Sequence, residues 1–182
     1  MRTIVLIMAW LLGAACAMAQ GCPPGPDFSR EHAALMRDLK AAPDETRANL
    51  VADRIWRLWT SAPDEHAQEL LDRGMERREA YDFEEAEAQF DALVAYCPAY
   101  AEGYNQRAFI RFLREKYDES LEDLDRTLEI TPDHFAALSG RALVLIRQGR
   151  PELAQQALRR AVALHPWIRE RHLLKKPVGI DL

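Results

Sequence analysis

Three prolines recur at one fixed interval in this sequence, because Pro98, Pro132 and Pro166 are spaced 34 residues apart. Each follows an apolar run with helical spacing, and proline ends a helix because it has no backbone N–H to donate. Periods of this length are typical of helical hairpins that stack side by side. The interval therefore predicts an all-α array in which each hairpin buries its apolar face against the next one.

The segments between the prolines share one pattern of residue types, which divides the chain into units at 67–100, 101–134 and 135–168. Small residues stand at the eighth and twentieth positions of each unit, and a large apolar residue stands at the twenty-fourth. In that order the positions hold Gly74, Ala108 and Ala142, then Ala86, Ser120 and Ala154, then Phe90, Leu124 and Leu158. Small residues let the two helices of a hairpin cross at about 8–10 Å. Because the same positions carry the same residue types in all three units, the pattern favours repeats over an unrelated helical bundle.

Helical patterns also flank the three units. Residues 28–62 predict an N-terminal hairpin, with helices at 30–41 and 45–61 and with Ser29 as the first N-cap. This hairpin is either a degenerate repeat or a cap, because its closing proline falls one residue out of phase with the others. Residues 169–182 predict a C-terminal cap and tail, whose short helix covers the last hairpin.

The first 19 residues have the layout of a secretory signal peptide. A positive start is followed by an apolar run at 4–12 and by a small-x-small cleavage site at 17–19. From residue 4 to the cleavage site at residue 19 there are 16 residues without charge, fewer than the roughly 20 that a spanning helix needs. We therefore expect cleavage before Gln20, no membrane span afterwards, and a flexible Pro/Gly-rich leader at 20–27. This pattern predicts export, to the periplasm if the host has two membranes.

The three cysteines bear on an alternative, a lipid-anchored protein. Cys16 and Cys22 both follow small residues, but neither has the leucine expected before a lipidated cysteine, so a lipoprotein is less favoured. After cleavage, Cys22 and Cys97 would remain. In an oxidising compartment these two cysteines could form a disulfide, but two cysteines alone do not indicate a disulfide-stabilised fold. We expect a buried thiol at Cys97 and a separate thiol in the leader, with their pairing left open.

On these residues the chain resembles the tetratricopeptide repeat (TPR) family. The unit 101–134 matches the repeat consensus at Tyr104, Ala108, Ser120, Leu124 and Pro132. Phe83 and Tyr117 match the aromatic residue that precedes the second helix, and Pro151 takes that place in the third unit. The stretches AEGYNQRA and HFAALSG are similar to those of a group of exported bacterial TPR proteins. The resemblance implies a superhelix, or solenoid, of three repeats that binds other proteins.

Two positions depart from the family pattern. The seventh position, commonly leucine, is arginine in all three units: Arg73, Arg107 and Arg141. The resemblance implies that such an arginine pairs with an acid on a neighbouring second helix. Asp123 is the candidate for Arg107, and either Asp123 or Asp125 is the candidate for Arg141. The eleventh position, often tyrosine, holds Arg77, Arg111 and Leu145.

The resemblance also implies that the first helix of each unit lines a concave face. The candidate partner-binding residues there are Met75, Asn105, Phe109, Phe112, Leu113, Ser139, Leu143 and Ile146. They form a mostly apolar floor around Asn105, whose amide both donates and accepts hydrogen bonds. We expect this floor to hold an extended or helical peptide. Two interpretations have equal weight: the face is open, or the N-terminal hairpin or the C-terminal helix covers it. The carboxylate clamp of some chaperone-binding TPR proteins is absent, because Leu71 and Met75 stand at its places.

No motif in the sequence indicates catalysis. The five histidines form no HExxH motif and no Cys/His metal spacing, and there is no GxSxG or Gly-rich phosphate loop. A formal net charge of −5 and the absence of Lys/Arg blocks argue against nucleic acid as a partner. We therefore expect no catalytic residues, no metal and no cofactor. The sequence predicts an exported adaptor or scaffold for protein–protein interaction, with a lipid-anchored component of an envelope assembly complex as the alternative.

Overall fold

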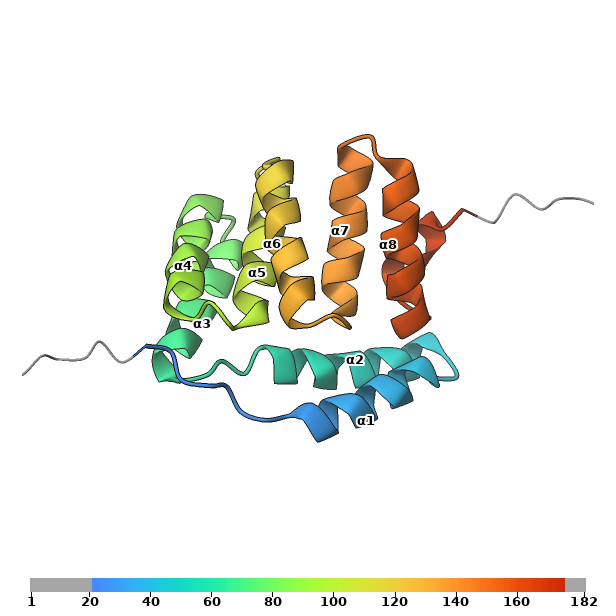
Figure 1. Ribbon diagram of the computed structural model, residues 1–182, viewed down its shortest axis with the longest axis horizontal. Coiled ribbons are helices and arrows are strands. Elements are labelled where there is room, and N and C mark those ends of the chain that lie inside the picture. Colours follow the sequence, from blue (N-terminus) through green and yellow to red (C-terminus); the bar gives the residue numbers. More distant parts are fainter. Residues whose placement is uncertain (1–20, 176–182) are drawn as a thin grey trace, which may run out of the picture.

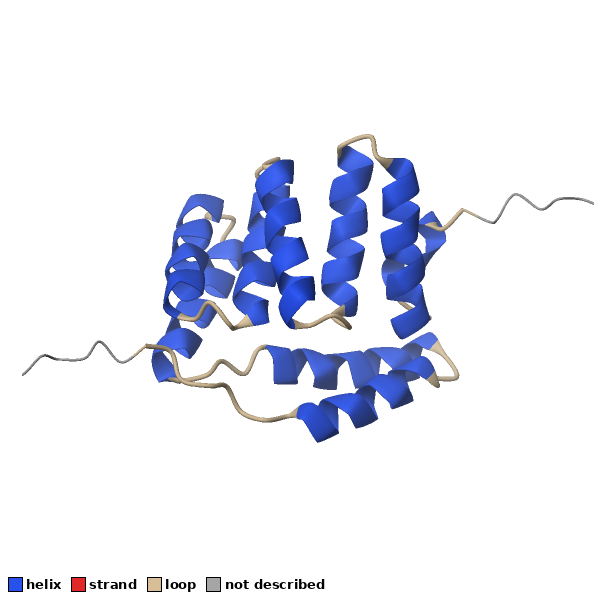
Figure 2. Ribbon diagram, in the orientation of Figure 1, coloured by secondary structure: helices blue, strands red, loops and turns tan. Residues whose placement is uncertain are grey.

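A computed structural model of the protein describes residues 21–175, and within this range it contains helices and no strand (Figures 1 and 2). The helices are α1 (Ser29–Lys40), α2 (Glu45–Trp59), α3 (Glu65–Glu79), α4 (Phe83–Tyr96), α5 (Ala101–Leu113), α6 (Tyr117–Ile130), α7 (Phe135–Arg147), α8 (Pro151–Leu164) and a short 3-10 helix, η1 (Arg169–Leu173). Helices α3 to α8 form three hairpins that stand side by side (Figure 1). This arrangement confirms the predicted all-α solenoid.

Small residues at the helix crossings explain why each hairpin closes. A Cβ atom on Gly74 of α3 would collide with the ring of Phe90 on α4. In the second hairpin the Oγ of Ser120 donates to the carbonyl oxygen of Ala108 at 2.7 Å, so the eighth and twentieth positions touch directly. Close packing of this kind cannot accommodate larger side chains without moving the helices apart.

The turn inside each hairpin contains a residue in the left-handed region at the same place in the repeat. Tyr81 and Glu115 have φ of 61°, and Gly149 has φ of 70°. In the second hairpin the N–H of Lys116 reaches back to the carbonyl of Arg111 at 2.8 Å, which completes a Schellman-type helix end. Only the third turn uses glycine, which adopts this conformation without strain.

The N-terminal hairpin does not stack in front of the first repeat. Helices α1 and α2 lie across the ends of the repeat helices (Figure 1), where Leu39 and Ile55 pack with Leu138 of α7. The indole N–H of Trp167 donates to the carbonyl of Ala42 at 2.9 Å. The hairpin therefore acts as a cap on the third repeat, although in sequence it precedes the first.

Two local expectations about the N-terminal segment are wrong. Ser29 is not a capping residue but the first residue of α1, and its N–H donates to Asp27 Oδ1 at 3.0 Å. Cys22 and Cys97 are not separate thiols, because they form a disulfide with a Cα–Cα distance of 5.0 Å. Cys97 is buried at the end of α4, as expected, and the leader brings Cys22 back to it across a separation of 75 residues. The disulfide thus ties the leader to the first repeat.

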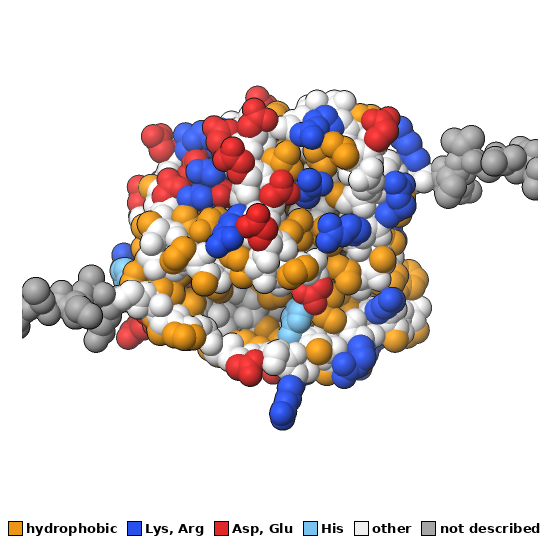
Figure 3. Space-filling model, in the orientation of Figure 1, with side chains coloured by type: hydrophobic (Ala, Val, Ile, Leu, Met, Phe, Trp, Pro, Cys, Tyr) orange, Lys and Arg blue, Asp and Glu red, His pale blue; other side chains and the backbone are white. Residues whose placement is uncertain are grey.

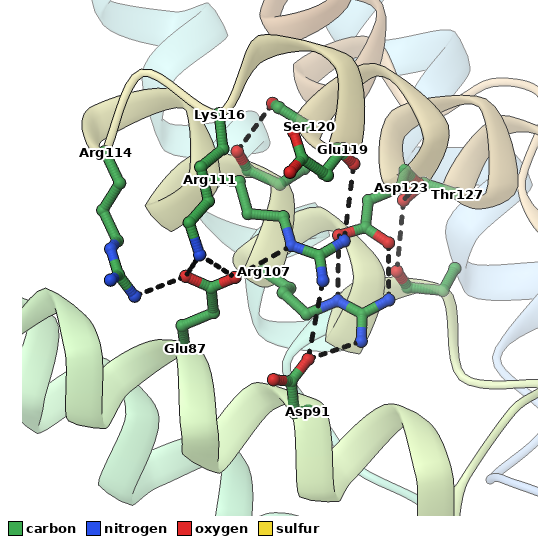
Figure 4. Close-up of polar contacts among 12 residues, drawn as sticks. Glu87, Asp91, Arg107, Arg111, Arg114, Lys116, Glu119, Ser120, Asp123 and Thr127 are labelled. Carbon is green, nitrogen blue, oxygen red and sulfur yellow. Dashed lines mark hydrogen bonds and ion pairs between the residues drawn. The ribbon is translucent and has the colours of Figure 1, made fainter.

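Ion pairs of two arginines join consecutive repeats, and Figure 4 shows those of Arg107. Arg107 donates to Asp123 on α6 at 2.6 and 2.9 Å and to Asp91 on α4 at 2.7 Å, which confirms the predicted pairing with Asp123. Arg141 pairs with Asp125 at 2.6 Å, which decides between the two acids considered for it. Each of these arginines therefore reaches back to the second helix of the preceding repeat.

Glu87 is the second acid at this interface, and its side chain is 8% exposed. It accepts hydrogen bonds from Lys116 at 2.9 Å, Arg111 at 3.1 Å and Arg114 at 2.6 Å (Figure 4). Burial opposes its ionisation, but the hydrogen bonds from Lys116 and Arg111 outweigh burial and hold the pKa of Glu87 below its ordinary value. Figure 3 shows charged side chains gathered over this part of the surface, around α4 to α6.

The predicted signal peptide at residues 1–19 lies outside the described residues, as does the C-terminal tail from residue 176. Within residues 21–175, no helix combines the length and the hydropathy that crossing a bilayer requires.

Candidate functional site

The candidate site is a cavity of about 300 Å³ between α5 and α7. Its floor is made of small residues, Ala108, Ser120 and Gly140, which leave space down to Leu124 of α6. Phe109, Phe112 and Leu143 line its walls. A cavity of this size, with mostly apolar walls, has the character of a ligand-binding pocket.

Four of the eight predicted partner-binding residues line this cavity: Asn105, Phe109, Phe112 and Leu143. Leu113 and Ile146 are on the same helices and are 39% and 41% exposed, but they do not line it. Ser139 is buried in the N-terminal half of α7, and no residue between 21 and 175 forms a hydrogen bond with its Oγ. Met75 is half-buried and packs against the core of the first repeat. The structure thus brings together half of the predicted set, and the role of these residues in binding stays a prediction.

Nine further lining residues were not among the candidates, and three of these add an aromatic ring, a cation and an amide to the cavity: Trp56, Arg78 and Gln106. A repeat signal was available for two of them. Arg78 stands at the twelfth position of its unit, as Phe112 does, and Gln106 is the direct neighbour of Asn105. Trp56 comes from α2, and its position follows from the way the N-terminal hairpin folds back, which the repeat pattern does not encode.

The N-terminal hairpin covers one end of the concave face and leaves the other end open. Trp59, at the end of α2, stacks on His134 with ring centroids 3.7 Å apart and also contacts Phe135 at the start of α7. Tyr100, just before α5, donates its hydroxyl to the carbonyl of Trp59 at 2.7 Å. Toward the other end of the same helices, Phe109 is 47% exposed. Each of the two expected alternatives therefore holds for one part of the face.

A buried carboxylate organises the covered end. Glu102, near the start of α5, is 1% exposed and accepts hydrogen bonds from Asn105 at 3.1 Å, Gln106 at 2.6 Å and His134 at 3.0 Å. His134 Nδ1 accepts from the N–H of Ala137 at 3.1 Å, so its Nε2 carries the proton that is donated to Glu102. His134, which lies between α6 and α7, therefore caps the N-terminus of α7 and also holds Glu102 in the first turn of α5.

The same carboxylate sets which way two amides face. An ionised carboxylate only accepts, so both Asn105 and Gln106 must direct their NH₂ groups toward Glu102. The oxygen of Gln106 then accepts from Arg78 Nη1 at 2.7 Å. The Oδ1 of Asn105 receives no hydrogen bond from any residue between 21 and 175, although the side chain lines the cavity. Asn105 therefore offers the cavity a free acceptor.

Arg78 supplies the positive charge of the site. Its guanidinium lies over the ring of Phe109, 5.9 Å from the centroid, and the nearest carboxylate, that of the exposed Glu79, is 3.8 Å away. The cavity thus combines apolar walls, one acceptor and one cation. Among the described residues, no group of three or more His, Cys, Asp or Glu side chains is placed to hold a metal ion.

A second, smaller cavity of about 190 Å³ lies behind the leader, and it belongs to the covered end. Pro26, Trp59, Tyr100 and Glu102 are among its lining residues. Burial raises the pKa of Tyr100, and the nearby charge of Glu102 raises it further, so its hydroxyl stays a proton donor. Figure 3 shows the surface hollowed between the N-terminal segment and the repeats.

Sequence comparison gives one matching family and several relatives. The tetratricopeptide repeat model matches residues 100–166. A TPR repeat-containing protein of Rhizobium etli is 32% identical over 138 residues, which cover 72% of this chain and 65% of that protein. A tetratricopeptide repeat protein 36 homolog of Nematostella vectensis is 37% identical over 71 residues, or 39% of each chain. This chain therefore spans less than two thirds of the length of these relatives.

Two solved structures share the fold. The first TPR domain of Spaghetti (RPAP3), bound to an HSP90 peptide, has a TM-score of 0.59 and is 18% identical, over 60% of this chain and 86% of that one. The Yersinia enterocolitica type III secretion chaperone SycD, in complex with a peptide of the translocator YopD, has a TM-score of 0.56 and is 14% identical, over 60% and 85%. Repeat pattern, family match and structural likeness agree, and the chain is a tetratricopeptide-repeat protein.

Proposed function

We propose that this protein is an adaptor that binds a peptide segment of another protein at the open end of its concave face. The observation that carries the proposal is the cavity of about 300 Å³ between α5 and α7, which is open where Phe109 is exposed. An apolar side chain of the partner would enter it and remove Phe109 and Leu143 from water. The peptides bound by the structural neighbours support this mode of binding.

The adaptor is best tested by comparing two double variants in the compartment where the protein works. Phe109→Ala with Leu143→Ala removes the walls of the cavity. Tyr81→Ala with Leu50→Ala is the matched control, because it deletes an exposed aromatic and an exposed leucine elsewhere on the surface. Pull-down and mass spectrometry should show that the first variant loses partners that the control keeps. Identical partner lists for both variants would argue against the cavity as the binding site.

We also propose that the protein is exported, and periplasmic in a host with two membranes. The signal-peptide layout of residues 1–19 supports this, and so does the disulfide, because disulfides persist mainly in oxidising compartments. A lipid-anchored component of an envelope assembly complex is the alternative. Once its sulfur is in the disulfide, Cys22 cannot carry a lipid thioether, which leaves Cys16 as the candidate. The intact mass of the mature protein separates the two: a free Gln20 start supports export without an anchor, and a diacylated cysteine supports the alternative.

A further inference from the structure

We propose that the partner anchors itself in the open cavity through a tryptophan side chain, whose indole fills the space and donates its N–H to Asn105 Oδ1. This inference rests on the proposed function, because it names the chemistry of the segment bound at the same site. Three independent properties of the cavity lead to it: its size, its fixed acceptor and its cation.

Size is the first property. An apolar cavity of about 150 Å³ in a protein is already large enough to bind benzene. The cavity here is about 300 Å³, so a single six-membered ring or a leucine side chain would leave part of it empty. Empty space beside Phe112, Leu124 and Leu143 forfeits dispersion contacts, and a two-ring side chain recovers them. The indole of tryptophan is the largest apolar ring system among the standard side chains.

The fixed acceptor is the second property. Asn105 cannot rotate its amide to present NH₂ to the cavity, because Glu102 already receives that group at 3.1 Å and offers no donor in return. The neighbouring amide of Gln106 is also fully used, between Glu102 and Arg78. A ligand group that reaches Asn105 Oδ1 must therefore donate a hydrogen bond. Among apolar ring systems, phenylalanine has no donor and indole has one N–H.

The cation is the third property. Arg78 lines the cavity, and within the described range 21–175 the only carboxylate within 4 Å of its guanidinium is that of the exposed Glu79. An arginine already placed over one aromatic ring favours a second electron-rich ring nearby, and indole is the strongest partner for a cation among the aromatic side chains. Tyrosine could donate to Asn105, but its ring is smaller and interacts more weakly with Arg78. The electrostatics and the size thus select the same side chain.

The test uses four short peptides that differ at one position. Each is an acetylated and amidated Gly/Ser peptide with a central tryptophan, benzothienylalanine, phenylalanine or leucine. Benzothienylalanine has the size and shape of tryptophan and lacks the N–H. Titration calorimetry with the full, disulfide-bonded protein should rank tryptophan tightest. The benzothienyl peptide should bind about two- to ten-fold more weakly, the range expected for one lost hydrogen bond, and phenylalanine and leucine weaker still.

A variant locates the hydrogen bond. In Asn105→Leu the acceptor is gone, so the tryptophan and benzothienyl peptides should bind within about two-fold of each other. Circular dichroism establishes that this variant is folded. If it does not fold, the wild-type comparison of the two peptides still decides the question. An unchanged preference for tryptophan over benzothienylalanine in folded Asn105→Leu would overturn the assignment to Asn105.

The failure of this inference is distinguishable from the failure of the proposed function. If the leucine or phenylalanine peptide binds as tightly as the tryptophan peptide, the indole anchor is wrong and the peptide-binding cavity stands. If no peptide binds while the Phe109→Ala and Leu143→Ala variant still loses its partners in the pull-down, the indole anchor is wrong in the same way. If no peptide binds and that variant keeps every partner, both proposals fail.

Discussion

Helices α5 and α7 present two different surfaces along one concave face. Where they begin, Glu102 and His134 form a buried hydrogen-bonded pair that Trp59 covers by stacking. Further along the same helices, Phe109 and Leu143 form an apolar wall, and Phe109 stays 47% exposed although Arg78 lies over its ring. Buried polar groups are satisfied by specific partners, so the covered end is built for one arrangement. Exposed apolar side chains beside a cavity instead favour association with another molecule.

This contrast predicts that changes at the covered end alter stability, whereas changes at the open end alter binding. The largest effect is expected for the disulfide that closes the leader over the covered end. It joins residues 75 apart, and a loop of that length corresponds to about 4 kcal/mol of unfolded-state entropy. Cys22→Ala with Cys97→Ala should lower the free energy of unfolding in urea by roughly that amount. Peptide binding at the open end, measured on folded protein, should be nearly unchanged, and a large loss of binding would contradict the separation of the two ends.

Removing the central carboxylate is expected to have the next largest effect. Glu102→Leu leaves three buried donors, on Asn105, Gln106 and His134, without their acceptor. An unsatisfied buried donor costs about 1–3 kcal/mol, so a loss of about 3 kcal/mol or more is expected from urea unfolding. Glu76→Leu, at an exposed position on α3, is the control and should cost little. A loss under about 1 kcal/mol for Glu102→Leu would mean that water replaces the carboxylate without penalty.

Two tryptophans of α2 provide a direct comparison of the ends. Trp59 stacks on His134 at the covered end, whereas Trp56 lines the open cavity. We expect Trp59→Ala to lower the free energy of unfolding by about 3 kcal/mol, as is typical for large-to-small changes at packed aromatic residues. Trp56→Ala should cost about 1 kcal/mol or less and should weaken peptide binding instead. Thermal melts measure the stability of both variants, and calorimetry measures their peptide binding. Equal losses of stability would contradict the proposed difference between the two ends.

The ion pairs behind the open end predict a pH dependence. Because the pKa of Glu87 is lowered in the folded protein, its ionised form contributes stability at pH values above the unfolded pKa near 4.5. That contribution is lost as the pH falls from about 4.5 toward the lower folded value. The melting temperature of Glu87→Gln should therefore be below that of the wild type at pH 7, and the difference should shrink by pH 3. A difference that stays constant across this range would show that Glu87 acts by packing alone.

The open end and the covered end also differ in how far the sequence reveals them. The crossing of Ala108 with Ser120 follows from the 34-residue period, because small residues recur at these two positions in every repeat. The pairing of Arg107 with Asp123 is instead implied by the resemblance to the TPR family. The candidate residues that line the cavity come from the same resemblance, applied to each repeat. Everything at the open end is therefore within reach of a pattern argument, except the wall that Trp56 contributes.

The covered end depends on contacts that no local pattern encodes. The hydrogen bond from Trp167 to Ala42 joins residues 125 apart, and the fold-back of α1 and α2 is decided by such long-range packing. The disulfide has the same origin, since Cys22 meets Cys97 only because the leader runs back along the first repeat. The sequence also predicts a binding role for Asn105 but not what orients its amide. The orienting residue is Glu102, and no sequence pattern indicates that Glu102 is buried.

The smallest predicted effect concerns the turns beyond the open end, where α5 and α7 finish. Glu115 and Gly149 occupy the same left-handed position in consecutive repeats, with φ of 61° and 70°. A side chain in this region costs about 1 kcal/mol, partly offset when glycine adds entropy to the unfolded chain. Glu115→Gly should therefore raise the free energy of unfolding by about 0.5 kcal/mol, and Gly149→Ala should lower it by about 1 kcal/mol. Neither turn residue lines the cavity between α5 and α7, so both variants should bind peptide as the wild type does. If Glu115→Gly changed the peptide affinity several-fold, the shape of the open end would depend on its turns, and the cavity would not be the preformed site that its packing indicates.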